Sequence, residues 1–483
     1  MIRRPPRSTH CISSAASDVY KRQIPFPKNT TTVVYYLSAR PNRSIRFRSQ
    51  SPVKLKGGDE DIKTTFFYGW VIVAVSATLG FLGTGFYSYS RGIFLDDLSI
   101  AIANGDRTEI SFAFSSAFVM GTLMAPFIGR LLDRSSPKRV LMCGVAIVTC
   151  SYLLLSQVET ILQFYLVTTI GMGLGMACMG GLAWHRSIIN WFDHWRGRAI
   201  ALGVLGASLS GIVMPQFVPE LIENFGWQTT YGIFAVSTAI TLFPVVFFLM
   251  KDKPEEIGEV RDGLSYVKTL SNQEANFNDE ADNAPWSIKQ MLRSPAFWSI
   301  GLIFGSMSAV FNATMLHMFS HIKDMGLNAA MVLSVTALFS AVGKPIIGWL
   351  SDYAGSRITI WLALISQVVG LLLFSQAYDF KVALLAASLY GFGYSGMSPL
   401  RTFSLSTSLG SNTYATASGV LKYVEAPIVL AASPMAGYIK DITGSYQLAF
   451  LVLAGIMLLA CVGPFFIKAG GALSRRKEAS SAH

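Results

Sequence analysis

The fold is decided by the stretch Gly129-Arg-Leu-Leu-Asp133-Arg134-Ser-Ser-Pro-Lys138-Arg139, a short charged turn between two long apolar runs. The runs on either side of it span residues 110–128 and 140–155. A second copy, Gly348-Trp-Leu-Ser-Asp352-Tyr-Ala-Gly355-Ser-Arg357, begins 219 residues later and also lies between apolar runs. One polar turn of the same layout in each half of the chain indicates that the chain consists of two repeated halves.

The composition is that of a membrane protein. Of the 483 residues, 52% are apolar and 14% are charged, whereas soluble proteins carry roughly 25% charged residues. We expect an all-α membrane protein, because only helices and closed barrels satisfy the backbone in lipid and these runs are too long and apolar for barrel strands. Twelve runs are long enough to cross a bilayer: 67–89, 110–132, 139–157, 161–188, 198–219, 227–250, 297–320, 328–350, 358–377, 381–407, 414–439 and 447–468.

The net charge of +11 belongs to an N-terminal tail. Residues 1–57 hold twelve Lys or Arg and one acid, and the remainder carries 27 residues of each sign. The membrane body is therefore neutral, and no nucleic-acid partner is expected.

We expect residues 1–64 to be a disordered or non-native basic tail. The segment has three interpretations: a transit peptide, a cytoplasmic tail near anionic lipid, or non-native sequence. We favour the third for residues 1–23, which resemble translated adapter sequence. The five cysteines show no metal-ligand spacing, and four of them lie in apolar runs, so we predict no metal and no cofactor.

The loops predict the orientation. The turns after the second, fourth and sixth runs carry Lys and Arg, and those after the third and fifth carry none. The positive-inside rule then places the even-numbered turns and both termini in the cytoplasm, and we expect a plasma-membrane protein. The expected organisation is a six-helix bundle over residues 65–250, a polar cytoplasmic linker over 251–296, a second bundle over 297–468 and a cytoplasmic tail over 469–483.

Four landmarks recur at nearly one offset. Gly129 matches Gly348; the other pairs are Gly171-Met-Gly173 with Gly391-Phe-Gly393, Gly203-Val-Leu with Gly419-Val-Leu, and Gly226-Trp-Gln228 with Gly444-Ser-Tyr-Gln447. The repeat predicts two pseudo-symmetric six-helix bundles with a cavity between them. The glycine pattern from Gly391 to Gly396 also fits a dinucleotide fingerprint, but no strand precedes it, so we interpret it as close helix packing.

Ionisable residues inside the apolar runs are the candidates for substrate binding, because a charge at membrane depth costs at least about 2.5 kcal/mol. These are Lys344, Lys422, Glu425 and His317. Lys422 and Glu425 are three residues apart on one helical face, so they can also form a structural ion pair. Lys344 can also extend to the headgroups, and His317 can be an interfacial histidine. We expect Arg186 and Arg401 to extend to the membrane surface.

The duplicated turn resembles the signature loop of major facilitator superfamily transporters, which usually reads G-x-L-x-D-R-x-G-R-K. The first copy has Ser136 in place of the second glycine, and the second copy has Tyr353 where arginine is usual. The resemblance implies that Asp133 and Asp352 face the N-termini of neighbouring helices across the bundle interface. Arg134, Arg139 and Arg357 would pair with nearby acids and help close the cytoplasmic gate, or simply fix the topology.

Four further motifs resemble the monocarboxylate transporter and oxalate/formate antiporter branch of this superfamily. They are Tyr68-Gly69-Trp70, Trp191-Phe192-Asp-His-Trp-Arg196-Gly197, Pro254-Glu-Glu-Ile-Gly258 and Asp441-Ile-Thr-Gly444-Ser445-Tyr446. In that branch a cation precedes the proline of helix 8, where Lys344 stands. This chain differs at Ser88, Ser340 and Glu425, where branch members have a lysine, an acid and a lysine respectively.

The resemblance implies a transporter that moves a small organic anion, a monocarboxylate or dicarboxylate, by alternating access. A proton or a counter-anion would be the coupled partner, and the lipid bilayer the surroundings. In this hypothesis Lys344 attracts the carboxylate while Lys422 and Glu425 exchange partners, with Glu425 a proton site. The alternative is a carrier or exporter of a neutral or cationic solute, which Glu425 would contact. An enzyme is not expected. It would need a nucleophile, a metal cluster or paired acids at membrane depth, and no set of His, Asp and Glu residues in this sequence has that arrangement.

Overall fold

The computed structural model describes residues 67–192, 195–261, 287–409 and 414–467, apart from a few side chains within helices that include Asp133 and Asp352. The chain divides into two units at residues 64 and 65, and all described residues belong to the second unit. The predicted tail over 1–64, with residues 1–23, lies outside the described residues, as do most of the predicted linker and the tail over 469–483.

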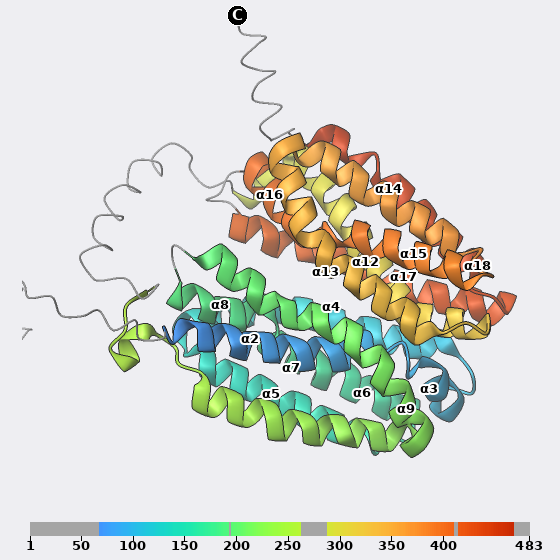
Figure 1. The fold of residues 1–483 in the computed structure, drawn as a ribbon, viewed down its shortest axis with the longest axis horizontal. Helices are drawn as coiled ribbons and strands as arrows, with labels where there is room; N and C mark the ends of the chain where they lie inside the picture. Colours follow the sequence, from blue (N-terminus) through green and yellow to red (C-terminus); the bar gives the residue numbers. More distant parts are fainter. Residues whose placement is uncertain (1–66, 193–194, 262–286, 410–413, 468–483) are drawn as a thin grey trace, which may run out of the picture. The chain divides into compact units, whose positions relative to one another are not determined.

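The first half of the described chain is a group of helices (Figure 1). It includes three π-helical turns, at Gly85–Tyr89, Val167–Met172 and Val245–Leu249. The segments are α2 (Gly69–Thr84), η2 (Gly85–Tyr89), α3 (Leu95–Ile102), α4 (Arg107–Arg134), α5 (Pro137–Leu155), α6 (Ile161–Leu166), η3 (Val167–Met172), α7 (Gly173–Met179), α8 (Gly181–Trp191), α9 (Arg196–Pro244) and η4 (Val245–Leu249). Helix α9 contains two predicted runs, because Gly226 has a φ of 79° and interrupts the helical backbone there. A left-handed φ of this kind favours glycine.

The second half repeats the arrangement. Its segments are α12 (Pro295–Asp324), α13 (Ala329–Ala354), α14 (Ser356–Phe374), α15 (Phe380–Ser395), α16 (Met397–Leu409), α17 (Tyr414–Thr443), α18 (Gln447–Ala460) and η8 (Gly463–Phe466). The short helices η5 (Pro254–Ile257) and α11 (Ile288–Arg293) lie in the described parts of the predicted linker. The described residues form helices and no strand, which agrees with the predicted all-α class.

Nine described segments are long and apolar enough to cross a membrane, and they correspond to ten of the twelve predicted runs because α9 holds two. The remaining two predicted runs are helical, but their helices are either too short or not apolar enough to count as membrane spans. The tenth run is divided at Gly396 into α15 and α16, each shorter than a span. The eleventh, α17, is 30 residues long but includes Lys422, Glu425, Lys440 and Asp441. The charged residues of α17 therefore lower its hydropathy below that of a typical membrane span.

The packing partners confirm the repeat. Helix α2 packs on the first part of α9 as α12 packs on α17, and α4 packs on α7 as α13 packs on α15. Glycine makes these contacts close: a Cβ at Gly206 would lie 1.8 Å from the carbonyl oxygen of Ala77. A Cβ at Gly391 would lie 2.2 Å from the carbonyl oxygen of Thr336. The glycine pattern from Gly391 to Gly396 thus serves helix packing, as predicted.

The two signature turns join their helices by different local geometry. Ser136 has a φ of −66°, and its side chain accepts a hydrogen bond from the backbone N–H of Arg139, which caps α5. Gly355 has a φ of 92° before α14. The serine is therefore compatible with the first turn, where the backbone conformation is extended and a side-chain cap is available.

Three of the four branch motifs lie together in the structure: those that begin at Tyr68, Trp191 and Pro254. The Trp191 Nε1–H donates to the Lys251 carbonyl at 3.0 Å, and the backbone N–H of Lys138 donates to Asp252 Oδ1 at 2.9 Å. The backbone N–H of Tyr68 lies 3.2 Å from Glu259 Oε2. These contacts fix residues 251–259 against the starts of α2 and α5 and the end of α8.

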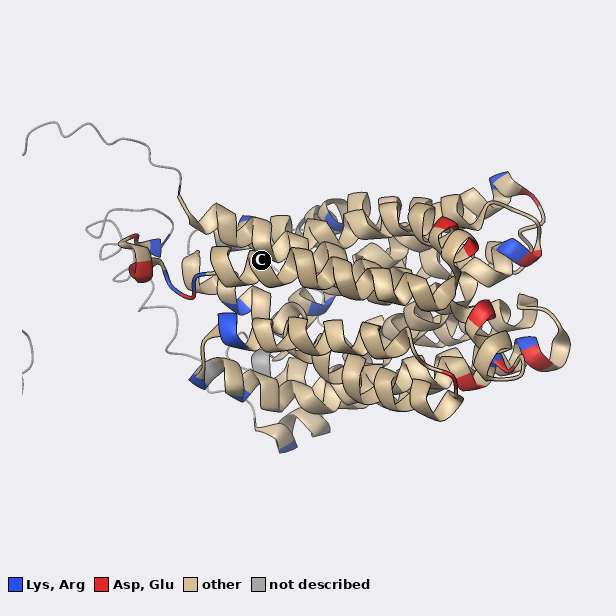
Figure 2. Ribbon diagram, turned by 90° about the horizontal axis from the view of Figure 1, so that it is seen from below, with Lys and Arg blue, Asp and Glu red and all other residues tan. Residues whose placement is uncertain are grey.

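The two halves meet along two pairs of helices, α4 with α17 and α9 with α13, which we call the seam. One end of the seam carries residues 129–139 and 348–357 and is called the signature-turn end. The other carries residues 95–108 and 437–446 and is called the network end. Figure 2 shows charged residues gathered toward the two ends of the helices, with few along the stretches between. This pattern is expected of helices that cross a bilayer.

Candidate substrate cavity

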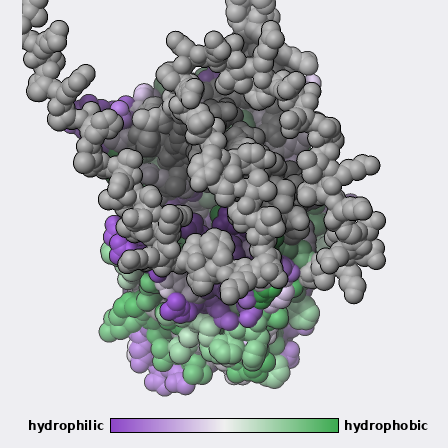
Figure 3. Space-filling view, turned by 90° about the vertical axis from the view of Figure 1, so that its left-hand side faces the viewer, coloured by the Kyte–Doolittle hydropathy of each residue, from purple (hydrophilic) through white to green (hydrophobic). Residues whose placement is uncertain are grey.

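A cavity of about 570 Å³ lies between the two halves. Residues of both halves line it, including Arg91, His185, Asn312, Arg401, Lys422 and Glu425. Its lining extends toward the signature-turn end through α8, α16 and the first turns of α17. Figure 3 views the molecule from that end, where hydrophilic and hydrophobic residues are both visible on the surface that uncertain residues leave uncovered. The predicted central cavity is therefore present.

On the second half, the cavity wall contains an ion pair. Arg401 Nη1 lies 3.1 Å from Glu425 Oε1 and 3.2 Å from Oε2, and the latter contact has hydrogen-bond geometry. Glu425 is 2% exposed. Within the described structure, Arg401 Nη2 and Glu425 Oε1 have no hydrogen-bond partner. A buried group without a partner loses hydration energy without compensation, so Arg401 Nη2 can donate to a polar ligand. Glu425 Oε1 is compensated by the charge of Arg401, 3.1 Å away.

Two predictions about this wall are corrected. Arg401 does not extend to the membrane surface, because it lines the cavity and its side chain is 14% exposed. The physical reason is that a buried carboxylate requires a cationic partner. Glu425 pairs with Arg401 and not with Lys422. Among the described residues, no carboxylate lies close enough to Lys422, within 4 Å, to form an ion pair. Lys422 therefore contributes an unpaired charge to the cavity.

On the first half, the cavity wall includes Arg91, which is not among the predicted site residues. The predicted first run ends at residue 89, two positions before this arginine. Arg91 is 5% exposed, and its Nη2 donates across the seam to the side-chain and backbone oxygens of Asn312, at 2.8 Å and 3.2 Å. A scan extended by one helical turn beyond each run would have found it.

The charged residues that line the cavity do not balance. Arg91, Arg401 and Lys422 supply three positive charges and Glu425 one negative charge, which leaves a formal excess of two with His185 neutral. A charge excess at membrane depth is unfavourable unless a counter-charge enters. The cavity therefore favours an anionic occupant.

Lys344 lies on the seam, and His317 of α12 contacts both helices of the α4–α17 pair. Neither residue lines this cavity. Lys344 Nζ donates to Ser208 Oγ at 2.8 Å, which links α13 to α9. His317 is 1% exposed; its Nε2 lies 2.9 Å from the Ser433 carbonyl and 3.3 Å from Ser111 Oγ. Two of the four predicted substrate residues are thus brought together in the cavity, and two connect helices.

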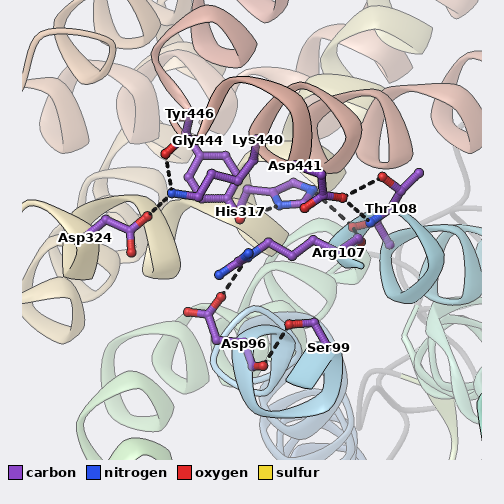
Figure 4. A network of polar contacts seen from close by, with 11 residues as sticks. Asp96, Ser99, Arg107, Thr108, His317, Asp324, Lys440, Asp441, Gly444 and Tyr446 are labelled. Carbon is purple, nitrogen blue, oxygen red and sulfur yellow. Dashed lines mark hydrogen bonds and ion pairs between the residues drawn. The ribbon is translucent and has the colours of Figure 1, made fainter. Parts of the chain in front are cut away.

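Polar contacts close the network end of the seam (Figure 4). The Thr108 backbone N–H and hydroxyl donate to Asp441 Oδ2 at 3.1 Å and 2.8 Å, and this contact joins the two halves. Arg107 Nε pairs with Asp96 at 3.0 Å within the first half. Tyr446 lies 3.4 Å from His317 Nδ1, and burial raises the pKa of its hydroxyl, which stays neutral. The two halves are therefore in contact at the network end of the seam.

The predicted gate residues are only partly described. The side chains of Asp133 and Asp352 lie outside the described part of the structure. Arg134 and Arg139 are exposed. Arg357 Nη2 donates to the Ile467 carbonyl at 2.6 Å, which joins the second signature turn to the segment after α18. The gate role of these five residues stays a prediction.

Comparison with known proteins agrees with this architecture. The family model described as Major Facilitator Superfamily matches residues 64–434. Monocarboxylate transporter 13 of Rattus norvegicus is 24% identical over 82% of this chain and 88% of its own length. Monocarboxylate transporter 2 of Homo sapiens is 24% identical over 82% and 84%, and the uncharacterized MFS-type transporter YcxA of Bacillus subtilis 23% identical over 76% and 88%. This chain belongs to the major facilitator superfamily, and it is an integral membrane transporter.

Proposed function

We propose that this transporter carries a small organic anion, a monocarboxylate or dicarboxylate, by alternating access of the central cavity. The observation that carries the proposal is the excess of two positive charges in the cavity wall. The names of the monocarboxylate transporters among the relatives support the same class of solute.

The cations stand on both sides of the seam. Arg91 belongs to the first half, whereas Arg401 and Lys422 belong to the second. Like charges on opposing walls repel each other more strongly in a low-dielectric site than in water. A carboxylate between them reduces this repulsion and therefore favours approach of the two halves. Binding would thus promote closure of the cavity around the anion.

The direction of opening follows from the charge distribution of the loops. With the signature-turn end in the cytoplasm, as the positive-inside rule predicts, the cavity in this structure faces the cytoplasm. The contact between Thr108 and Asp441 then closes the opposite side. Transport requires that this contact open while the signature-turn end closes, with Asp133 and Asp352 as proposed members of the second gate.

Glu425 is the proposed coupling residue, since it is the one acid among the described cavity residues. Glu425→Gln keeps a polar side chain near Arg401 but cannot release or bind a proton. We expect counterflow of unlabelled against labelled lactate to persist, while accumulation driven by a pH gradient is lost. One pH unit corresponds to about a tenfold concentration ratio per coupled proton. Uptake into proteoliposomes with and without the gradient measures both, and the exposed Glu223→Gln is the control. Unchanged accumulation in Glu425→Gln would exclude this residue from coupling.

Lys344 is proposed to act through the seam, because it bonds to Ser208 and not to cavity residues. A hydrogen bond to a charged group contributes about 1.5–3 kcal/mol, so Lys344→Met is expected to change the maximal rate about tenfold with little change in KM. Ser208→Ala should have the same effect, because it removes the other partner. A raised KM in Lys344→Met alone would instead indicate that this lysine binds the carboxylate directly.

A carrier or exporter of neutral or cationic solutes is the alternative, with Glu425 as the contact. Thermal unfolding of the purified protein distinguishes the two, because a ligand that binds only the folded state raises the unfolding temperature. Lactate, pyruvate and oxalate should stabilise the protein more than lactamide or tetraethylammonium, and the difference should shrink in Arg401→Gln. Stabilisation by the cation alone would favour the alternative.

A further inference from the structure

A second, much smaller cavity lies behind Arg91, inside the first half. Its volume is about 10 Å³, which is close to the space that one water molecule needs. Arg91, Tyr152 and Thr168 line it together with apolar and aromatic side chains. A dry cavity of this size would be lined by apolar atoms only, whereas this one contains polar side chains from three separate segments.

Three polar atoms in this lining have no hydrogen-bond partner within the described structure. They are Arg91 Nε, Tyr152 Oη and Thr168 Oγ1, and their side chains belong to residues that are 5%, 2% and 1% exposed. One such atom would be costly, because an unpaired buried polar group loses about 1–3 kcal/mol. Three of them around one cavity indicate a shared partner that the protein itself does not supply.

Local backbone geometry directs these residues to the cavity. Thr168 lies in the π-helical turn Val167–Met172, and Arg91 follows the π-helical turn Gly85–Tyr89. Such turns in α-helices are uncommon and frequently occur at functional sites. Phe86 stacks on Phe234 with ring centroids 4.0 Å apart, which packs the apolar side of the cavity. Two π-helical turns in different segments therefore contribute to the same small space.

We propose that one ordered water molecule occupies this cavity, and that Tyr152 and Thr168 are positioning residues for Arg91. The water oxygen accepts from Arg91 Nε–H, and its two hydrogens are donated to Tyr152 Oη and Thr168 Oγ1. This gives three hydrogen bonds, the usual number for a buried water. Rigid support of a binding group by a second layer of side chains is a common requirement of precise sites.

The guanidinium of Arg91 is then satisfied on two sides. Nε faces the water, and Nη2 donates to Asn312 across the seam at 2.8 Å. Of its five N–H groups, those on Nη1 remain for an anion in the central cavity. The proposal rests on the proposed function for the identity of that anion, but the water itself does not depend on it.

The test is a cryo-EM map of the full-length protein in nanodiscs at a resolution that shows ordered water, for the unmodified chain, Thr168→Val and Thr168→Ser. We expect density between the three polar groups in the unmodified chain and in Thr168→Ser, and none in Thr168→Val. The Arg91 contact with Asn312 should be lost or displaced in Thr168→Val. Thr149→Val is the matched control, since Thr149 is an unpartnered threonine of α5 outside both cavities.

Lactate uptake provides the second measurement. Thr168→Val and Tyr152→Phe should raise KM about tenfold, equivalent to ~1.4 kcal/mol, with Thr168→Ser and Thr149→Val close to the unmodified protein. Absence of density, where other buried waters are resolved, would overturn the water site. If the unmodified protein shows the water density, but Thr168→Val changes neither the position of Arg91 nor the KM, the positioning role is overturned. If the unmodified protein does not take up lactate, the proposed function fails while the maps still decide both the water and the position of Arg91.

Discussion

Arg91→Gln should reduce uptake of a small carboxylate at least about 100-fold, which corresponds to ~2.7 kcal/mol of lost interaction. Among the described residues of the first half that line the cavity, Arg91 is the one that carries a full charge. Its side chain is buried, with 5% of the residue exposed. Removal of one partner from a buried charge pair costs about 2–5 kcal/mol. Glutamine keeps a donor for Asn312 but removes the charge, so folding should persist while anion binding is lost.

Two variants make this prediction specific. Arg91→Lys should recover part of the uptake, because lysine keeps the charge but lacks the planar fork that binds a carboxylate with two bonds. Lys381→Gln removes an exposed lysine at the start of α15 and should leave uptake unchanged. Initial rates in proteoliposomes, with equal protein per vesicle, measure all three. Uptake by Arg91→Gln at a rate near that of the unmodified protein would contradict an anion site at this residue.

Gly206→Val should prevent formation of a folded protein. An added Cβ at Gly206 would lie 1.8 Å from the Ala77 carbonyl oxygen and 2.6 Å from its carbon. The obstacle is backbone of α2, which cannot rotate away as a side chain can, so the two helices must separate along their length. Overpacking of a tight core costs about 1–3 kcal/mol or more, and valine adds two further methyl carbons beyond this Cβ.

The measurement is size-exclusion chromatography of a fluorescent fusion in mild detergent. Gly455→Val, in α18, is the matched control because a Cβ at Gly455 meets no atom within 4 Å. We expect a single symmetric peak from the control and aggregate from Gly206→Val. A monodisperse Gly206→Val with the thermal stability of the control would mean that α2 and α9 are not packed as this structure has them.

The fold could be predicted largely from the sequence, since membrane helices are visible as uncharged runs and the repeat as a constant offset. The bounds of a span agree best with the prediction where the run is uniformly apolar, as in α18. They were hardest to delimit where a glycine divides a helix, as at Gly396, or where charged residues lie within it, as in α17. Hydropathy averages over such positions and therefore gives the span but not its interruption.

The site could be predicted only in part. Lys422 and Glu425 stand out because each interrupts an apolar run, and both line the cavity. The partner of Glu425 could not be derived, because Arg401 is 24 residues away and only packing of α16 against α17 brings the two together. Lys344 interrupts a run as clearly as Lys422 does, yet it faces Ser208 on the seam. Linear sequence identifies a charge at membrane depth but not the direction in which it points.

The most direct test of the central claim is competition between matched carboxylates and amides for uptake into proteoliposomes of the purified protein. Labelled lactate is supplied on one side, and unlabelled lactate, pyruvate, oxalate, lactamide or oxamide is added at equal concentration. A cavity with two uncompensated positive charges predicts inhibition by the three carboxylates and none by the two amides, which match them in shape but carry no charge. Equal inhibition by an acid and its amide, or transport that none of the carboxylates affects, would contradict the anion site.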